Sequence, residues 1–177
     1  MHPTNTLFNE TTSSQAKLVS LLSSSGLHVS CAESCTGGLI AAAITEISGS
    51  SSVFECGVCS YSNRIKHEVL CVRQETLDTY TELSLQTAEE MATGVLKLSH
   101  SDIAVSTTGV AGPTGGTDEN PVGTVYIAIV NRSQILYSEK VNFNPTLTLS
   151  RDEIRKACTN YCLEKLCLAV TAMTENL

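Results

Sequence analysis

A serine stands in a short glycine-containing segment, Ala32–Gly38, whose sequence is Ala-Glu-Ser-Cys-Thr-Gly-Gly. An apolar run, residues 27–32, precedes it, and a run of good helix formers, residues 39–44, follows it. This order predicts a strand, a tight turn that holds Ser34, and a helix. The free N–H groups and partial positive charge of a helix N-terminus suit an anion. Ser34 would then combine a hydroxyl nucleophile with a place for developing negative charge, as acyl transfer requires.

Two interpretations of this segment are open from its residues alone. In the structural interpretation, the hydroxyl of Ser34 or Thr36 only caps the following helix. In the chemical interpretation, Gly37 and Gly38 remove side chains where the atoms of a ligand must come close to the backbone. The other candidate catalytic residues of the chain distinguish between the two interpretations.

A serine hydroxyl is a poor nucleophile and needs a base. The chain has four histidines, His2, His28, His67 and His100. No local pattern presents one of them to Ser34, and surface or core roles are favoured for all four. Lys66 is the other candidate, since it follows Tyr61 by five residues after a predicted strand end. Burial and a nearby helix N-terminus both lower the pKa of a lysine, so that the amine can be neutral and act as a base.

We therefore expect Ser34 as nucleophile and Lys66 as base, with the Tyr61 hydroxyl orienting the base or relaying a proton. The competing interpretation makes Lys66 a solvated helix residue and Tyr61 a half-buried strand end.

Two further segments suggest anion binding. The glycines of residues 109–116 allow backbone amides to line an anionic or planar ligand, although a simple turn is the alternative and no Walker motif follows. Arg151 and Arg155 lie one helical turn apart near a predicted helix start, where cations are electrostatically disfavoured. Their placement suggests pairing with an anion such as phosphate. Salt bridges to Asp152 or Glu153 are the alternative.

Composition limits the class of protein. The 177 residues suffice for one domain, residues 13–177, after a flexible N-terminal tail, residues 1–12. A net charge of −7 argues against a general nucleic-acid surface, so an anionic small substrate would need a local basic site. No apolar run is long enough for a membrane span, and the N-terminus lacks the apolar core of a signal peptide. We expect a cytoplasmic protein.

The eight cysteines do not form a recognisable metal or disulfide framework. Cys56 and Cys59 lie three apart on a predicted strand and so face opposite sides. Cys158 and Cys162 share a helix face but have no partnering histidine or second Cys-x-x-Cys pair. We expect reduced, mostly buried thiols and neither metal nor cofactor.

The elements that position these residues follow from hydrophobic periodicity and caps. Helices are predicted over residues 13–24, 39–49, 62–70 and 73–80, and two further helices are predicted to begin at Ser84 and Ser150. Strands are predicted over residues 27–32, 53–61, 102–108, 122–130 and 134–141. Helices separate the early strands and a hairpin lies near the end. This favours an α/β fold, a three-layer α/β/α sandwich with a mixed sheet. Sites in such sheets form beyond the carboxyl ends of strands, where residues 33–38, 61–66 and 108–116 lie.

Four motifs in this order and spacing resemble the CinA C-terminal family. They are residues 32–38, Ser60-Tyr61-Ser62-Asn63 with Lys66, residues 108–113 with Gly115 and Gly116, and residues 121–125. The similarity runs from about Ser13 to Leu168, and the family includes single-domain nicotinamide-nucleotide amidases. This sequence departs from the family pattern at residues 81–83 and 149–151.

The resemblance implies conversion of nicotinamide mononucleotide and water to nicotinate mononucleotide and ammonia, a step of pyridine nucleotide salvage. It implies Ser34 as nucleophile, Lys66 and Tyr61 as its helpers, and neither metal nor cofactor. It also implies substrate contacts at Cys35, Thr36, Gly37, Gly38, Thr108, Gly109, Ala111, Gly112, Arg151 and Arg155. Among these, the amides of residues 35–38 would hold the oxyanion and Arg155 is the expected late arginine of the family. A homo-oligomer, dimer or higher, is implied as well.

Two alternatives to the amidase stay open. The chain could be an inactive relative that binds a nucleotide or regulates a partner, although such a protein would not need Ser34, Tyr61 and Lys66 together. Alternatively, Cys35 is the nucleophile, because a thiol at a helix start ionises easily.

Overall fold

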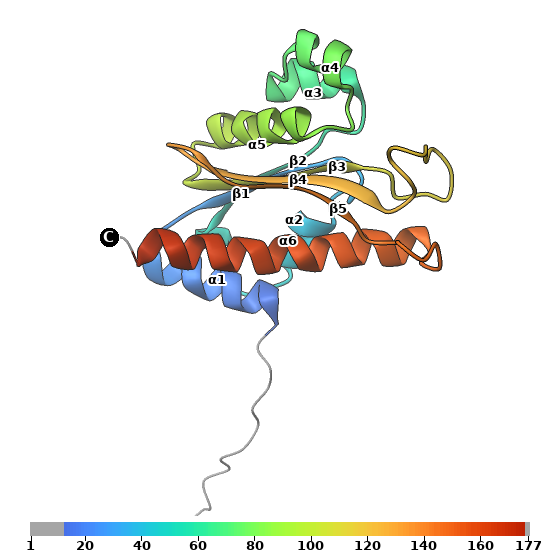
Figure 1. The fold of residues 1–177 in the computed structure, drawn as a ribbon. Helices are drawn as coiled ribbons and strands as arrows, with labels where there is room; N and C mark the ends of the chain where they lie inside the picture. The colour runs from blue at the N-terminus through green and yellow to red at the C-terminus, as the bar shows by residue number, and fades with distance from the viewer. Residues whose placement is uncertain (1–12, 176–177) are drawn as a thin grey trace, which may run out of the picture.

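Three apolar runs form the parallel part of a five-stranded sheet with the strand order β2-β1-β3-β4-β5 (Figure 1). The computed structural model describes residues 13–175, so the predicted tail, residues 1–12, lies outside the described residues. β1 pairs in parallel with both β2 and β3, whereas β4 and β5 add an antiparallel hairpin. The strands are β1 (Val29–Glu33), β2 (Phe54–Cys59), β3 (Ile103–Gly109), β4 (Thr124–Asn131) and β5 (Ile135–Asn142).

Helices cover both faces of this sheet, which confirms the predicted three-layer α/β/α sandwich (Figure 1). One layer contains α1 (Ser14–Ser25), α2 (Leu39–Thr45) and α6 (Arg151–Thr174). The other contains α3 (Asn63–Leu70), α4 (Gln74–Tyr80) and α5 (Leu85–Ser99). A separate apolar cluster lies on each side of the sheet, which fixes both layers. None of the helices described between residues 13 and 175 combines the length and apolar character needed to cross a membrane.

Serine caps set three helix starts as predicted. Ser62 accepts a hydrogen bond from the Ile65 N–H, and Ser84 accepts one from the Thr87 N–H. Ser150 and Glu153 form a capping box at the start of α6. The prediction that the second helix reaches Gly49 was wrong. It ends at Thr45, and Gly49 adopts a left-handed φ of 89° that a continuing helix cannot contain.

The parallel strands end side by side. Glu33 is in register with Cys59 on β2 and with Thr107 on β3. Beyond the register, the Ser34 N–H donates to the Thr107 carbonyl oxygen at 2.9 Å, and the Ser60 N–H donates to the Glu33 carbonyl oxygen at 2.8 Å. The residues that follow β1 and β2 therefore emerge together beside the end of β3, at the right-hand side of Figure 1.

A glycine in α5 determines how close α3 can come. A Cβ atom on Gly94 would lie 1.9 Å from the carbonyl oxygen of Leu70, the last residue of α3. No side chain of the neighbouring helix is in the way, so the contact is between backbones and cannot be relieved by a rotamer change. Gly94 thus allows α3, which carries Lys66, to pack against α5.

We predict that Gly94→Ala destabilises the protein by about 1–3 kcal/mol, because the added methyl group overpacks a backbone contact. Thermal unfolding followed by circular dichroism measures the effect. Thr93→Ala, on the adjacent half-buried position of α5, is the matched control and should change stability little. Helix propensity alone favours Ala over Gly by about 1 kcal/mol, so a rise in stability of Gly94→Ala would contradict this packing argument.

Candidate active site

A cavity of about 480 Å³ opens at the carboxyl ends of β1, β2 and β3. Residues from the segments 33–38, 61–66 and 108–116 all contribute to its wall, among them Ser34, Lys66 and Gly109. Glu82 and Leu83, from the connection between α4 and α5, and Arg151, at the start of α6, complete the wall. Residues distant in sequence therefore meet in one open depression.

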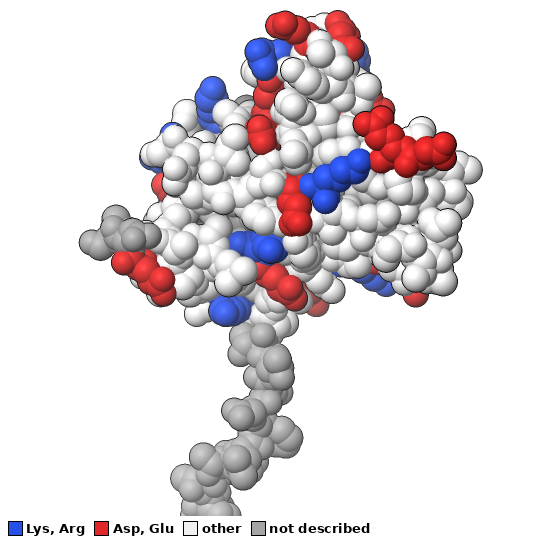
Figure 2. All heavy atoms as spheres, viewed as in Figure 1, with Lys and Arg blue, Asp and Glu red and all other residues white. Residues whose placement is uncertain are grey.

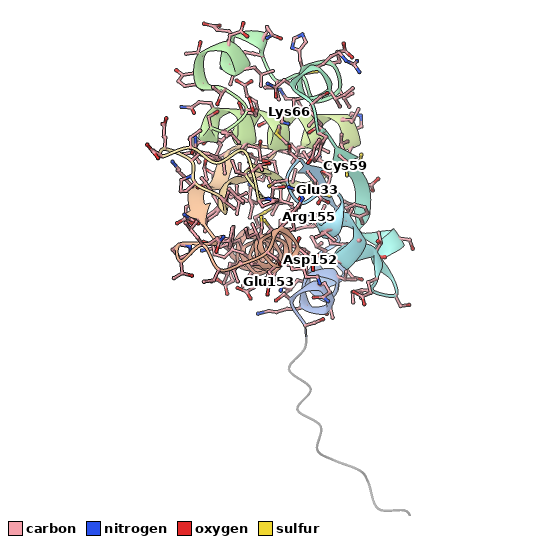
Figure 3. All side chains as sticks on the ribbon, turned by 90° about the vertical axis from the view of Figure 1, so that its right-hand side faces the viewer. Glu33, Cys59, Lys66, Asp152, Glu153 and Arg155 are labelled. Atoms are coloured by element: carbon pink, nitrogen blue, oxygen red, sulfur yellow. The ribbon has the colours of Figure 1, made fainter. Side chains whose placement is uncertain are left out.

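Ser34 and Lys66 are in direct contact in this cavity. The Lys66 Nζ lies 3.0 Å from Ser34 Oγ and donates a hydrogen bond to the carbonyl oxygen of Ser60 at 2.9 Å. The exposed fraction is 1% for Lys66 and 9% for Ser34. The interpretation of Lys66 as a solvated helix residue is therefore wrong. Figure 3 shows Lys66 above Glu33, on the side of the sheet that α3, α4 and α5 cover.

Burial lowers the pKa of the Lys66 amine from its ordinary value of 10.5, because the ammonium form loses its water. The negative charge of Glu82, and to a smaller extent Cys35, acts in the opposite direction. A neutral amine at this position has a lone pair that can accept the proton of the Ser34 hydroxyl at the observed distance. The pair therefore has the geometry and the electrostatics of a nucleophile with its base.

Tyr61 lies at the mouth of the cavity, with an exposed fraction of 67%. Its hydroxyl accepts a hydrogen bond from Arg151 Nη2 at 3.0 Å. Within residues 13–175, no hydrogen bond joins it to Ser34 or Lys66. The structure thus places Tyr61 beside Arg151 rather than beside the serine and lysine, and the interpretation of a half-buried strand end is wrong.

Glu33 occupies the helix start that the sequence suggested as an anion site. Its Oε2 accepts hydrogen bonds from the N–H groups of Gly38 at 2.9 Å and Ile40 at 3.2 Å, and its Oε1 accepts one from Ala41 at 2.9 Å. The side chain is 1% exposed. The helix begins at Leu39, as predicted, and the two residues before it, Gly37 and Gly38, adopt left-handed φ angles of 61° and 96°.

This carboxylate has two consequences for the sequence-based interpretation. The positive end of α2 is already paired, so it cannot be the cause of the lowered pKa of Lys66 that we expected. The N–H of Gly38 is likewise occupied. Sequence reasoning gave Glu33 no role, although an acidic residue directly before a glycine turn and a helix is the signal that could have found it.

The expected substrate contacts Thr36, Gly37, Gly38 and Arg155 do not line the cavity. The Thr36 hydroxyl is buried against the Thr107 hydroxyl at 2.8 Å. Arg155 donates from Nε and Nη2 to the Thr36 carbonyl oxygen at 3.2 and 2.8 Å, and its guanidinium packs on Gly37. These residues hold the backbone of the turn. Neither Ser34 nor Thr36 caps α2, whose N-cap position is Gly38 without a side-chain cap, so the structural interpretation is wrong.

Arg151 is the late arginine that reaches the cavity. It donates from Nη1 to the carbonyl oxygen of Gly112 at 2.6 Å, in addition to the Tyr61 contact. Neither Arg151 nor Arg155 makes a salt bridge to an acidic residue in the described part of the chain, so the salt-bridge alternative is wrong. Asp152 pairs with Lys156, and Glu153 belongs to the capping box.

The predicted glycine loop lines the cavity through Thr108, Gly109, Ala111 and Gly112. The Thr108 hydroxyl donates to the Glu82 carbonyl oxygen at 2.7 Å, which ties the loop to the α4–α5 connection. A Cβ atom on Gly109 would lie 2.4 Å from the Thr124 carbonyl oxygen, so this glycine is needed for the approach of β4.

All eight cysteines are free thiols, and five of them are buried, as predicted. A hydrogen bond with Cys158, together with burial, raises the pKa of the Cys35 thiol well above its ordinary value. This disfavours the thiolate and therefore the interpretation of Cys35 as nucleophile. Among residues 13–175, no group of three or more His, Cys, Asp or Glu side chains is placed to hold a metal ion.

A larger cavity of about 690 Å³ lies elsewhere, between the start of β5 and the last turns of α6. Its wall is mainly apolar, with Leu27, Leu136 and Met173 among its residues. No serine in its wall contacts a lysine in the part of the chain that the structure describes. The contact between Ser34 and Lys66 therefore belongs to the smaller cavity.

Comparisons with known proteins match most of the chain. The CinA C-terminal domain family matches residues 11–170. The nicotinamide-nucleotide amidohydrolase PncC of Enterobacter agglomerans is 49% identical over 123 residues, which cover 70% of this chain and 75% of PncC. A CinA-like protein of Shewanella pealeana is 46% identical over 147 residues, which cover 83% of this chain. The chain spans about a third (34%) of the length of that relative.

Solved structures are similar over nearly the whole chain. The competence/damage inducible protein CihA from Agrobacterium tumefaciens has a TM-score of 0.83 at 42% identity, covering 88% of this chain and 93% of that one. A CinA superfamily protein from Klebsiella pneumoniae has a TM-score of 0.84 at 32% identity, covering 90% of this chain and 96% of that one.

We predict that Glu33→Gln lowers the free energy of unfolding by about 1–3 kcal/mol, because an amide has only one oxygen to accept the three N–H groups that Glu33 now serves. Urea denaturation measures the change. Glu46→Gln, at the exposed end of the same helix, is the matched control and should have little effect. Equal stability of the two variants would show that Glu33 does not hold the turn.

Proposed function

The chain belongs to the CinA C-terminal domain family, and from this premise we propose that it is an amidohydrolase that converts nicotinamide mononucleotide and water to nicotinate mononucleotide and ammonia. The observation that carries the proposal is the 3.0 Å contact between the buried Lys66 amine and Ser34 Oγ at the base of an open cavity. Similarity to the nicotinamide-nucleotide amidohydrolase PncC of Enterobacter agglomerans supports the choice of substrate. The reaction would belong to pyridine nucleotide salvage.

The proposed reaction uses Ser34 and Lys66 twice. Neutral Lys66 takes the proton of the Ser34 hydroxyl while Oγ attacks the carboxamide carbon and a tetrahedral intermediate forms. The resulting Lys66 ammonium gives its proton to the departing nitrogen, the C–N bond breaks and ammonia leaves. Lys66 then takes a proton from water, whose oxygen attacks the acyl-Ser34 ester. Return of a proton to Ser34 releases the carboxylic acid product.

Backbone N–H groups would hold the oxyanion of the intermediate. The N–H groups of Gly38, Ile40 and Ala41 are excluded, because they already donate to Glu33. We assign the role to the part of the turn that precedes Gly38, beginning with Cys35, which lies next to the nucleophile on the cavity wall. The Glu33 and Arg155 contacts on either side keep this backbone in place before the substrate arrives.

Arg151 would bind the phosphate of the nucleotide. It is a cation on the cavity wall with no acidic partner among residues 13–175, and its hydrogen bonds to Gly112 and Tyr61 fix its direction. A planar guanidinium suits phosphate oxygens. The Tyr61 hydroxyl is close enough to Arg151 to contact the same phosphate, which gives Tyr61 a binding role at the mouth.

Ammonia release from nicotinamide mononucleotide tests the proposal. We expect the wild-type protein to release ammonia, Ser34→Ala to lose more than about a thousandfold in kcat, and Cys35→Ala to keep most of its rate. Loss of activity only in Cys35→Ala would make the thiol the nucleophile. Binding of the nucleotide by wild type without any ammonia release would support the inactive, nucleotide-binding alternative.

The dependence of the rate on pH tests the role of Lys66. Only the neutral amine is a base, so kcat/KM should fall as the pH drops through the pKa of Lys66, which burial places below 10.5. Lys66→Arg keeps a positive charge but cannot be neutral in this pH range, and we expect it to lose about a hundredfold or more. Full activity of Lys66→Arg with an unchanged profile would contradict the role of the lysine.

A further inference from the structure

Glu82 is a cavity residue to which neither the sequence motifs nor the proposed reaction gives a role. It lies in the connection between α4 and α5 and is half-buried on the cavity wall. Its Oε2 accepts a hydrogen bond from Asn63 Nδ2 at 3.2 Å, and its carbonyl oxygen accepts one from the Thr108 hydroxyl at 2.7 Å. Both the side chain and the backbone of Glu82 are thus held in place.

The cavity contains two opposite charges that are not paired with each other. Glu82 lines the same cavity as Ser34 and Lys66, and its negative charge acts on the Lys66 amine. Arg151 is held by Gly112 and Tyr61, and no salt bridge joins it to Glu82 in the described part of the chain. On the face drawn in Figure 2, acidic and basic side chains are interspersed.

We infer that Glu82 is a specificity-determining residue that favours amides on a positively charged ring. This inference rests on the proposed function. In a nicotinamide nucleotide, the ring that bears the carboxamide contains the quaternary nitrogen, whereas the phosphate lies beyond the ribose. A carboxylate on the cavity wall that also holds Ser34 and Lys66, and a guanidinium bound to the exposed Tyr61, match a substrate with two separated charges of this kind. Pairing of the ring with Glu82 and of the phosphate with Arg151 would direct the carboxamide toward Ser34.

A purely structural role for Glu82 predicts a different effect of its substitution. The Asn63 contact is a single hydrogen bond at an exposed position, and the Thr108 contact uses only the backbone of Glu82. Substitution of the carboxylate by an amide of the same shape leaves both contacts available. An effect of Glu82→Gln that depends on the charge of the ligand therefore cannot come from the loss of these contacts.

The test compares two ligands that differ in ring charge. The first is nicotinamide mononucleotide, and the second is benzamide riboside monophosphate, which keeps the carboxamide, ribose and phosphate but has an uncharged ring. Dissociation constants are measured by calorimetry in a Ser34→Ala background, where no turnover interferes, with and without Glu82→Gln. Glu75→Gln, an exposed position of α4 outside the cavity, is the matched control.

We expect Glu82→Gln to weaken binding of nicotinamide mononucleotide on the order of fivefold to tenfold, as for loss of a partly exposed charge pair, and to change binding of the neutral ligand less than about twofold. In the Ser34-containing protein, kcat/KM for nicotinamide mononucleotide should fall by a similar factor at a pH where Lys66 is already neutral, since Glu82→Gln also lowers the pKa of Lys66. Glu75→Gln should change none of these values.

Equal weakening of both ligands, or no weakening of either, would overturn the inference. Absence of nicotinamide mononucleotide binding in the Ser34→Ala background would overturn it as well. Failure of the proposed function is a different result, because wild type would then release no ammonia even where the two ligands bind with the expected difference.

Discussion

The candidate active site depends on one buried amine in contact with one hydroxyl. An ammonium group that leaves water without an acidic partner in direct contact costs several kcal/mol, and the usual response is loss of the proton. Lys66 donates to a carbonyl oxygen and lies against Ser34. Burial lowers the pKa of its amine by more than the negative charge of Glu82 raises it. In the proposed reaction, the fold therefore supplies a base through desolvation, with no histidine among the described residues of the cavity wall.

The remaining architecture keeps this contact in place from several sides. The parallel register of β1, β2 and β3 brings the turn after Glu33 and the chain after Cys59 to the same edge of the sheet. At Gly94, α5 contacts the backbone of α3, and this contact positions α3 and therefore Lys66. Glu33 and Arg155 hold the two sides of the serine turn, so its backbone geometry does not depend on a bound ligand.

The sequence predicted the layers, the sheet and the meeting of Ser34 with Lys66, because strand ends and caps are local signals and parallel strands bring their ends together. It could not predict side-chain directions. Tyr61 faces Arg151, and Arg155 turns to the Thr36 carbonyl, since local packing decides these directions. The sequence also could not predict that Glu33 accepts the N–H groups at the start of α2, because this contact depends on how the turn at Gly37 and Gly38 folds. Glu82 and Gly94 matter only through contacts that distant parts of the chain create.

Titration of the Lys66 amine tests the central claim most directly. In a sample labelled with ¹³C at the lysine ε-carbons, NMR can follow the Lys66 signal with pH, and the Lys66→Arg variant assigns it. We expect a titration midpoint below 10.5, with the neutral form populated while the protein is folded. A midpoint at or above 10.5, with an ammonium group throughout the range in which the protein is active, would contradict the account.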